Sequence, residues 1–258
     1  MSEQPRPAHE NHILASLPPE DYERLRPHLE PFEMKHGHVL HQPGETLKYV
    51  YFPENSMISL ISHTAAGESV EVGVVGFEGM AGVSAVLGAD TAPHEAMVQI
   101  HDGGTRLGVS ELREEFRRGG VLHDMLLRYT QTLLLQTSQV AACNRLHSLS
   151  ERLAPWLLMS LDRCVCDELP FTQEFLSLML GVRRAGVTEA AIILQAEGLI
   201  HYTRGRITVI DRPGLETHSC ECYPVVRDEF NRLVGANSAR SSENRTQNPP
   251  PQIPGRRR

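Results

Sequence analysis

The sequence predicts an α+β protein built in three successive parts, and three patterns support this prediction. Short β-rich segments separated by turns fill the stretch from Met34 to about Leu112. An uninterrupted apolar repeat then runs from Val121 to Asn144, which is the pattern of one long helix. Two shorter helical segments and a pair of β-rich segments follow between Phe171 and Ile210.

The composition is that of an ordinary globular protein. Of 258 residues, 40% are hydrophobic, and no apolar run approaches the roughly 18 to 20 residues needed to cross a bilayer. The N-terminus lacks the apolar stretch of a signal peptide, and the five cysteines form no even set of disulfides, so we expect a cytoplasmic protein with no membrane partner. The net charge of −7 argues against a chain that coats nucleic acid everywhere but permits a local basic face.

The N-terminal part begins with predicted helices. Asn11 to Leu29 is expected to form one or two short helices, the second opened by Pro18-Pro19. In the β-rich segments that follow, alternate residues are expected to face a core, as in a sandwich or roll: Val70, Val72 and Val74.

The long helix predicted from Val121 to Asn144 carries an apolar seam. Its members recur at spacings of four and three residues, the period of a coiled coil: Leu122, Leu126, Tyr129, Leu133, Gln136, Val140 and Cys143. At 1.5 Å per residue the helix would be roughly 36 Å long, which is too long and too one-sided for burial by a small β domain alone. We therefore predict a homodimer interface along this seam, with Gln136 setting the register. The alternative is a helix that packs only within its own chain.

A further helix is predicted to begin after this one. Ser148 and Glu151 have the spacing of a capping box, which places a domain boundary at about residues 145–150. Pro155 lies inside the new helix, where it removes a backbone hydrogen bond, and it predicts a kink beside Trp156.

The stretch from Phe171 to Leu194 is typical of a helix-turn-helix. Gly181 stands where the first helix must stop, and the apolar anchors are expected to be Leu176, Leu180, Val187 and Ile192. Two arginines are then expected in the first turn of the second helix, where arginine can reach guanine or phosphate. The predicted DNA-facing residues of the two helices are Thr172, Gln173, Arg183, Arg184, Thr188 and Glu189.

A hairpin follows this pair of helices. The run from Leu199 to Ile210 contains two β-rich segments around Arg204-Gly205. Arg204 and Arg206 are therefore predicted to lie at the tip of a wing, where they would touch phosphates and not bases.

Four stretches between Glu151 and Arg227 follow one another in a specific order: ERLAPWLL, DELPFTQEFLSLMLGVRRAGVTEAA, EGLIHYTRGRITVIDRPGLE and CECYPVVR. This segment resembles the C-terminal half of Crp/Fnr-superfamily transcription regulators. The resemblance implies a homodimer on two-fold symmetric double-stranded DNA, with RNA polymerase as a further candidate partner. Where the superfamily usually has a small N-capping residue and a polar base reader, this chain has Arg183 and Ala185, so we do not expect the superfamily's best-known half-sites.

The β-rich half carries three matching stretches: Gln42-Pro43-Gly44-Glu45, Tyr49 to Pro53 and Gly76 to Gly82. It resembles the superfamily's sensory half, a cupin-like β-roll related to cyclic-nucleotide-binding domains. Nucleotide-binding members carry a Gly-Glu-Leu segment and a phosphate-binding arginine, whereas this chain has Gly79-Met80-Ala81 and Pro93-His94.

The effector is accordingly not expected to be cyclic AMP. No arginine lies between Lys48 and Arg106, and a buried phosphate without a cationic or N–H partner would be costly. An iron–sulfur cluster in the sensory half is excluded because no cysteine precedes Cys143. The effector and its binding residues are left unknown.

Two residue groups raise a metal hypothesis. His36, His38, His41 and Glu45 resemble the metal motif of cupin enzymes, although Glu45 follows the second histidine at a longer spacing than in those enzymes. Two Cys-x-Cys pairs, Cys164/Cys166 and Cys220/Cys222, lack the Cys-x-x-Cys spacing of zinc sites, and positions i and i+2 of a helix point apart. We therefore expect buried free thiols, no metal and no cofactor.

The sequence as a whole predicts a DNA-binding transcription regulator and no enzyme. Residues 1–118 would form a β-roll sensor domain, 119–147 a dimerisation helix, 148–234 a winged helix-turn-helix domain and 235–258 a disordered tail. The alternatives are a regulator that responds to a cyclic nucleotide and a metal-dependent cupin enzyme with an accessory domain.

Overall fold

The computed structural model describes residues 10–166 and 168–235. The chain begins with the helices α1 (His12–Ala15) and α2 (Pro19–Leu25), followed by a 3₁₀ turn at Arg26–His28. Asn11 caps α1 by accepting from the backbone N–H of Ile13, and its side-chain amide donates to the carbonyl oxygens of Pro53 and Gly79. The predicted N-terminal helices are therefore present, and Asn11 fixes them to the β-rich part.

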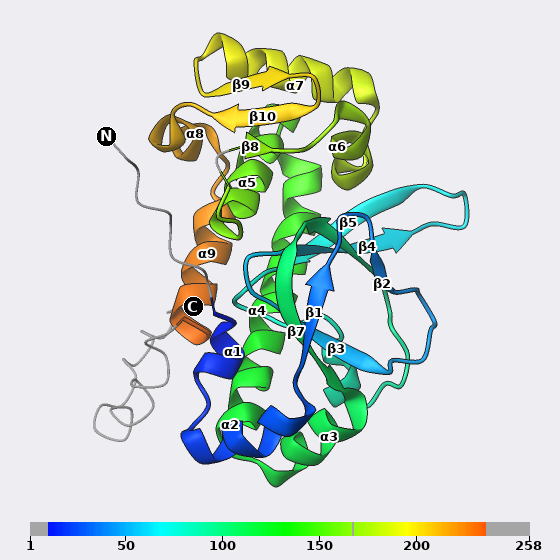
Figure 1. The fold of residues 1–258 in the computed structure, drawn as a ribbon. Coiled ribbons are helices and arrows are strands. Elements are labelled where there is room, and N and C mark those ends of the chain that lie inside the picture. Colours follow the sequence, from blue (N-terminus) through cyan, green and yellow to red (C-terminus); the bar gives the residue numbers. More distant parts are fainter. Residues whose placement is uncertain (1–9, 167, 236–258) are drawn as a thin grey trace, which may run out of the picture.

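Two antiparallel sheets form the β-roll (Figure 1). One has the order β2-β6-β4-β5, made of β2 (Val39–His41), β6 (Glu95–Ile100), β4 (Met57–His63) and β5 (Ser69–Val75). The other has the order β1-β7-β3, made of β1 (Glu30–Met34), β7 (Asp102–Gly108) and β3 (Tyr49–Pro53). A 3₁₀ turn at Val83–Val86 and helix α3 (Val109–Arg118) complete this part. Both sheets contribute to one core, whose fully buried members include Val50, Phe52, Ile58, Val98 and Leu107.

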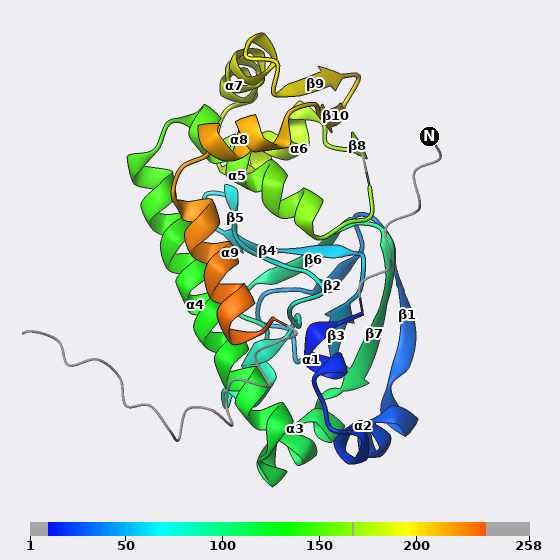
Figure 2. The same cartoon turned by 90° about the vertical axis from the view of Figure 1, so that its left-hand side faces the viewer.

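Helix α4 (Val121–Leu146) runs along the molecule beside the roll (Figures 1 and 2). The predicted helix is confirmed, but the seam assigned to a dimer packs against the helix's own chain. Leu122, Leu126 and Tyr129 are fully buried in the core of the roll. Gln136 is also buried, and its Oε1 accepts from the backbone N–H of Val74, 2.8 Å away. Gln136, predicted to set the register of a dimer, therefore bonds within its own chain, and Leu133 and Val140, at the edge of this face, are only half-buried.

Helix α9 (Cys222–Leu233) explains why that seam is buried. It returns from the C-terminal part and lies against α4 (Figure 2). Its Val226 and Phe230 join the core of the roll, and the Phe230 ring lies 6.3 Å from that of Tyr129. The long helix is therefore covered on one side by a segment about 90 residues further along the chain.

The C-terminal part is a compact helical unit with a small sheet. It contains α5 (Leu149–Asp162), α6 (Gln173–Leu180), α7 (Arg184–Ala196) and α8 (Arg212–His218). Its sheet has the order β8-β10-β9, made of β8 (Glu168–Leu169), β10 (Arg206–Val209) and β9 (Ile200–Thr203). The core of this unit continues into the roll, because Met57, Ile61 and Val74 pack within it. The predicted α+β fold class, with a β-roll, a long helix and a winged helix-turn-helix, is confirmed.

The start of α5 confirms the predicted capping box. Ser148 accepts from the backbone N–H of Glu151, and the Glu151 carboxylate accepts from the backbone N–H of Ser148. Pro155 is buried within α5 and has no N–H to offer the carbonyl of Glu151, four residues earlier. That carbonyl instead accepts from the backbone N–H of Cys220, 3.4 Å away. The proline therefore frees an acceptor that ties α5 to the segment before α9.

The cysteines depart from the expectation of free thiols. Cys164 and Cys166 are joined by a disulfide, which their irregular backbone after α5 permits and a helix would not. Cys143, Cys220 and Cys222 are free and buried. Within the described part of the chain, no helix is long and apolar enough to cross a membrane. The predicted tail lies outside the described residues from position 236 onward.

Candidate nucleic-acid interface

Helix α6 is held in place by its N-cap and by the packing of its apolar face. Thr172 is the N-cap, and its hydroxyl accepts from the backbone N–H of Phe175, 3.1 Å away. Leu176 and Leu180 are buried, as the sequence predicts. Phe171, just before the helix, packs edge-on against Trp156 of α5, with ring centroids 4.8 Å apart.

The turn after α6 depends on Gly181. Its φ of +62° is left-handed, a region that residues with a Cβ rarely adopt, and the backbone N–H of Val182 bonds to the carbonyl of Ser177. This turn aims the start of α7 outward. Arg183 is the N-cap residue with extended backbone and Arg184 is the first helical residue, so only one of the two arginines lies within the first turn.

The apolar side of α7 differs in one position from the prediction. Val187 is fully buried, but Ile192 is 57% exposed. Ala191 and Leu194 are buried in its place. Residue 192 follows Val187 by five positions, which is about 500° of rotation on an α-helix and leads to a different face.

The exposed start of α7 gathers the predicted DNA-facing side chains. Arg183, Arg184 and Glu189 are exposed, and Thr188 is half-buried with its hydroxyl bonded to the carbonyl of Arg184. The Arg184 guanidinium also donates to Oε1 of Gln173 on α6, 3.3 Å away. Arg184 is therefore held against the preceding helix, whereas no hydrogen bond or ion pair among the described residues restrains the side chain of Arg183.

The hairpin of β9 and β10 forms the predicted wing. Its two-residue turn places Arg204 at φ +48° and Gly205 at φ +78°, the left-handed pair that matches the twist of a tight hairpin. Arg204 is exposed at the tip. Arg206, in contrast, pairs with Glu168 of β8, with 2.9 Å between Nη1 and Oε1.

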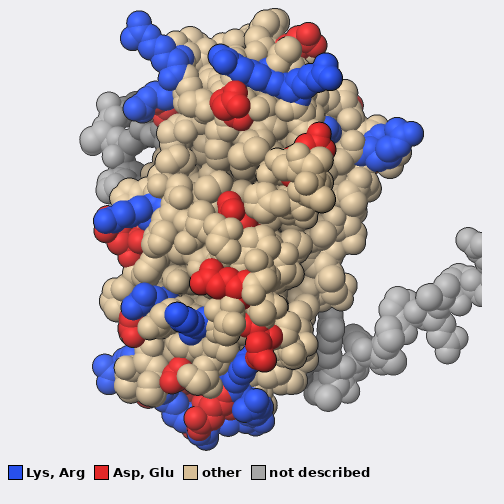
Figure 3. Space-filling model, turned by 90° about the vertical axis from the view of Figure 1, so that its right-hand side faces the viewer, with Lys and Arg blue, Asp and Glu red and all other residues tan. Residues whose placement is uncertain are grey.

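A concave surface joins the wing to the two helices. Thr172, Gln173, Arg184, Tyr202 and Arg204 line it together. Four of the eight predicted DNA-facing residues therefore line one hollow. A fifth, Arg183, is the N-cap residue next to Arg184 in the sequence. Figure 3 shows basic side chains at the upper end of one face, the end that carries α7 and the hairpin in Figure 1.

This arrangement of two helices and a wing corresponds to a known domain. Residues 151–218 match the family model of the Crp-like helix-turn-helix domain. The chain carries a Crp-like helix-turn-helix domain. No curated protein sequence matches the chain.

Solved structures extend the similarity beyond the Crp-like domain to the fold. A protein from Eubacterium rectale described as a transcriptional regulator of the Crp/Fnr family is 18% identical, with a TM-score of 0.62, and the match covers 81% of this chain and 99% of that one. FixK2 from Bradyrhizobium japonicum is 15% identical, with a TM-score of 0.61, covering 74% and 98%. The c-di-GMP-responsive regulator CLP from Xanthomonas campestris is 16% identical, with a TM-score of 0.60, covering 74% and 99%. The fold is therefore that of Crp/Fnr-family transcription regulators.

A pocket lies between the β-roll and α4, away from the Crp-like domain. Its lining includes His41, His94, Leu133 and Thr137, and none of the described residues that line it is Lys or Arg. Burial lowers the pKa of His41 to about 4 and also lowers the pKa of His94, so both imidazoles are neutral near pH 7. Met80 is buried in the core and offers no carboxylate to a sugar hydroxyl. This pocket therefore offers a phosphate no fixed positive charge.

The histidines of the suggested cupin motif do not converge. His36 Nδ1 bonds to the carbonyl of Gln99, His38 packs against the ring of Phe32, and Glu45 accepts from the backbone N–H of Gln42. Among the described residues, the side chains that do converge with metal-ligand chemistry are Cys143, His147, Cys220 and Cys222. Sequence reasoning missed His147. The available signal was its i+4 spacing from Cys143 at a helix end.

Proposed function

We propose that this protein is a sequence-specific transcription regulator that binds double-stranded DNA as a homodimer. The observation that carries the proposal is the exposed start of α7, where Arg184 lines one hollow together with the wing residue Arg204 and the exposed Arg183 precedes it at the N-cap. A helix presented by its N-terminal turn suits the major groove, and basic residues of a wing suit the flanking phosphates. The eight residues assigned from the sequence keep these roles as part of the proposal.

The dimer surface that we propose differs from the predicted seam. Along the solvent-exposed part of α4, Leu127 is 45% and Leu134 is 60% exposed, seven residues apart, with exposed Ala141 a further seven residues on. Leu134 also borders the pocket between α4 and the roll. A seven-residue apolar repeat is the period of a two-stranded coiled coil. Pairing two copies along this stripe would give a two-fold axis along α4, as a palindromic DNA site requires.

The control of DNA binding is proposed to reside in the roll. Its pocket contacts α4 through Leu133 and Thr137, so an occupant would bear directly on the proposed dimer helix. The absence of Lys and Arg from the described lining favours a neutral or apolar occupant over a cyclic nucleotide. The alternative of a cyclic-nucleotide-responsive regulator predicts micromolar binding of such a nucleotide to the full chain, which isothermal calorimetry would detect.

The DNA-binding proposal is tested by selecting duplexes from a random pool with the full chain and measuring affinity by fluorescence anisotropy. The double variant Arg183→Ala/Arg184→Ala is expected to lose at least 100-fold in affinity for the selected duplex and to approach its affinity for random DNA. Arg117→Ala/Arg118→Ala is the matched control, because it removes the same charge from an exposed pair at the far end of α3. An unchanged ratio of specific to random binding in the first variant would contradict the proposal.

A further inference from the structure

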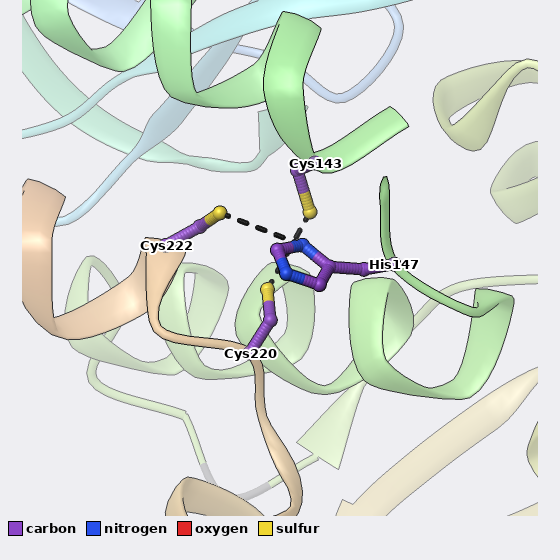
Figure 4. Close-up of side chains that lie close together, drawn as sticks. All are labelled: Cys143, His147, Cys220 and Cys222. Atoms are coloured by element: carbon purple, nitrogen blue, oxygen red, sulfur yellow. Dashed lines mark hydrogen bonds between the residues drawn. The ribbon is translucent and has the colours of Figure 1, made fainter. Parts of the chain in front are cut away.

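Four side chains with metal-ligand chemistry meet at the junction between α4 and the C-terminal unit. Cys143 lies in the last turn of α4, His147 ends that helix, Cys220 precedes α9 and Cys222 is its first residue. Figure 4 shows the four side chains pointing toward one another. Their ligand atoms all lie within 4.8 Å of one another, with 3.5 Å between the Sγ atoms of Cys143 and Cys220 and 3.7 Å between Cys222 Sγ and His147 Nδ1.

We propose that these residues form a Cys₃His site for one structural zinc ion. Zinc–sulfur bonds of about 2.3 Å and zinc–nitrogen bonds of about 2.0–2.1 Å in a tetrahedron place neighbouring ligand atoms roughly 3.5–3.8 Å apart. The two separations of 3.5 and 3.7 Å agree with this spacing before any adjustment of the side chains. Four protein ligands close the coordination sphere, which is the arrangement of a structural zinc site and not of a catalytic one.

The local backbone brings both members of the Cys-x-Cys pair to one point. On a continuous helix Cys220 and Cys222 would point apart, but Cys220 lies before the helix begins. Its backbone N–H bonds to the carbonyl of Glu151, which is free because Pro155 cannot donate to it. This bond fixes the backbone at Cys220, and both thiols of the pair point toward the end of α4.

The other two ligands are placed by the end of α4. Cys143 and His147 are four residues apart, and the backbone N–H of His147 bonds to the carbonyl of Cys143 at 3.2 Å. His147 then leaves the helix with ψ of 150°, and its ring lies beside the thiols. Positions i and i+4 share one face of a helix, so this spacing suits chelation of one ion.

A carboxylate supports the histidine from outside the cluster. Oε2 of Glu221, the residue between the two cysteines, lies 3.3 Å from His147 Nε2. A proton on Nε2 that is donated to this carboxylate leaves Nδ1, the nitrogen facing the thiols, free to bind the ion. Metal-bound histidines commonly donate their second nitrogen to a carboxylate in this way.

The charge and burial of the cluster also suit a metal–thiolate centre. All three cysteines are buried, at 6–8% exposure. Arg152, which is half-buried, lines one pocket together with Cys143 and Cys222. Three thiolates and one dication leave a net charge of −1, which this guanidinium would balance.

The site would cross-link segments that are far apart in the sequence. It would join the C-terminal end of α4 to the start of α9, immediately before the Crp-like domain begins at residue 151. This inference does not depend on the proposed DNA-binding function, because the zinc would fix the junction whatever the Crp-like domain binds. It departs from the expectation of no metal that the sequence alone supports.

The competing chemistries make different predictions. A disulfide between Cys143 and Cys220 would need oxidation and would remove two ligands. An iron–sulfur cluster would hold its ligands on two or more iron atoms, with some ligand atoms farther apart than the 4.8 Å found here. The spacing therefore fits one tetrahedral ion, and Cys₃His is a ligand set of structural zinc sites.

The test is the metal content of the full chain purified under reducing conditions without chelator. Atomic spectrometry is expected to find one zinc per chain, and Cys143→Ser and Cys222→Ser are each expected to lower it at least tenfold. Cys164→Ser is the matched control, because it removes a buried cysteine outside the cluster and is expected to retain one zinc. Zinc at trace levels, an iron chromophore, a Cys143–Cys220 disulfide in peptide mapping, or full zinc content in the Cys143 or Cys222 variant would each overturn the proposal.

A second measurement keeps the test valid if those variants do not fold. The wild-type chain is stripped with a chelator and titrated with Co²⁺. Saturation at one equivalent, with the intense visible bands of tetrahedral Co²⁺ and a thiolate charge-transfer band, is the expected result. Weak bands typical of octahedral cobalt, or no saturation at one equivalent, would refute a Cys₃His site.

Discussion

The indole Nε1 of Trp156 on α5 donates to Oε1 of Glu71 on β5, across 2.7 Å. Ser59 of β4 donates to the other carboxylate oxygen, and Glu71 is almost completely enclosed. Its burial raises the pKa of Glu71 to about 7, although both hydrogen bonds lower it. A titratable carboxyl group therefore lies where the β-roll meets the Crp-like domain, a contact that no local pattern in the sequence indicates.

Because Glu71 is buried with a raised pKa, we expect the free energy of unfolding to fall as the pH rises toward neutrality. Because the pKa is about 7 in the fold and close to 4.5 in the unfolded chain, the folded state binds more protons between these values. The contribution of this group is complete below about pH 4.5, on the order of 3 kcal/mol, and is lost as the pH passes through about 7. Glu71→Gln should flatten this part of the dependence and raise the melting temperature at pH 8. The measurement is thermal unfolding from pH 5 to 8 at fixed protein concentration, and parallel curves for the two proteins would contradict it.

Trp156→Phe tests the hydrogen bond itself. Phenylalanine retains an aromatic ring against Phe171 and Phe175 but removes the donor to Glu71, so we expect a loss of about 1–3 kcal/mol in the free energy of unfolding near pH 8. The loss should be smaller near pH 5, where Glu71 is protonated and the buried oxygen carries no charge. Urea denaturation followed by circular dichroism measures both values, because the variant has no tryptophan fluorescence. An equal loss at both pH values would show that packing alone explains it.

The two wing arginines are predicted to differ. Arg204 is exposed at the tip, whereas the charge of Arg206 is partly neutralised by Glu168. If Arg204 contacts a phosphate, Arg204→Ala should weaken binding to selected and random DNA alike and reduce the slope of log affinity against log salt by about 1. Arg206→Ala should change the slope by less. Anisotropy titrations at several salt concentrations decide this, and a loss confined to the selected duplex would place Arg204 on a base.

The parts of the fold that were predictable from the sequence are those set by short-range signals. The capping box at Ser148, the left-handed turn at Gly181 and the hairpin at Arg204-Gly205 each depend on a few neighbouring residues, and each is confirmed. Ile192 was predicted to be buried and is exposed, so even a short-range prediction can fail. It follows the buried Val187 by five positions and therefore lies on another face of the helix.

The features that could not be predicted depend on partners distant in the chain. The repeat along α4 correctly identified a buried face, but periodicity does not say what buries it, and here α9 and the roll do so. Cys143 and Cys220 are 77 residues apart, so their approach at 3.5 Å follows from the return of α9 along α4 and not from either local motif. The Glu71–Trp156 bond, across 85 residues, has the same origin.

The exposed stripe of α4 and the seam predicted from the sequence lead to opposite expectations about which substitutions disrupt a dimer. If two copies pair through Leu127, Leu134 and Ala141, then Leu134→Glu would bury like charges at the two-fold axis and should yield a monomer. Gln136→Leu should leave the oligomeric state unchanged, because Gln136 faces its own chain, while losing the bond to Val74 should lower the free energy of unfolding by about 1–3 kcal/mol. Ile210→Glu is the matched control, since it adds the same charge at an exposed apolar residue outside α4. Sedimentation equilibrium separates the outcomes: a dimeric Leu134→Glu together with a monomeric Gln136→Leu would restore the seam as the interface and reject the stripe.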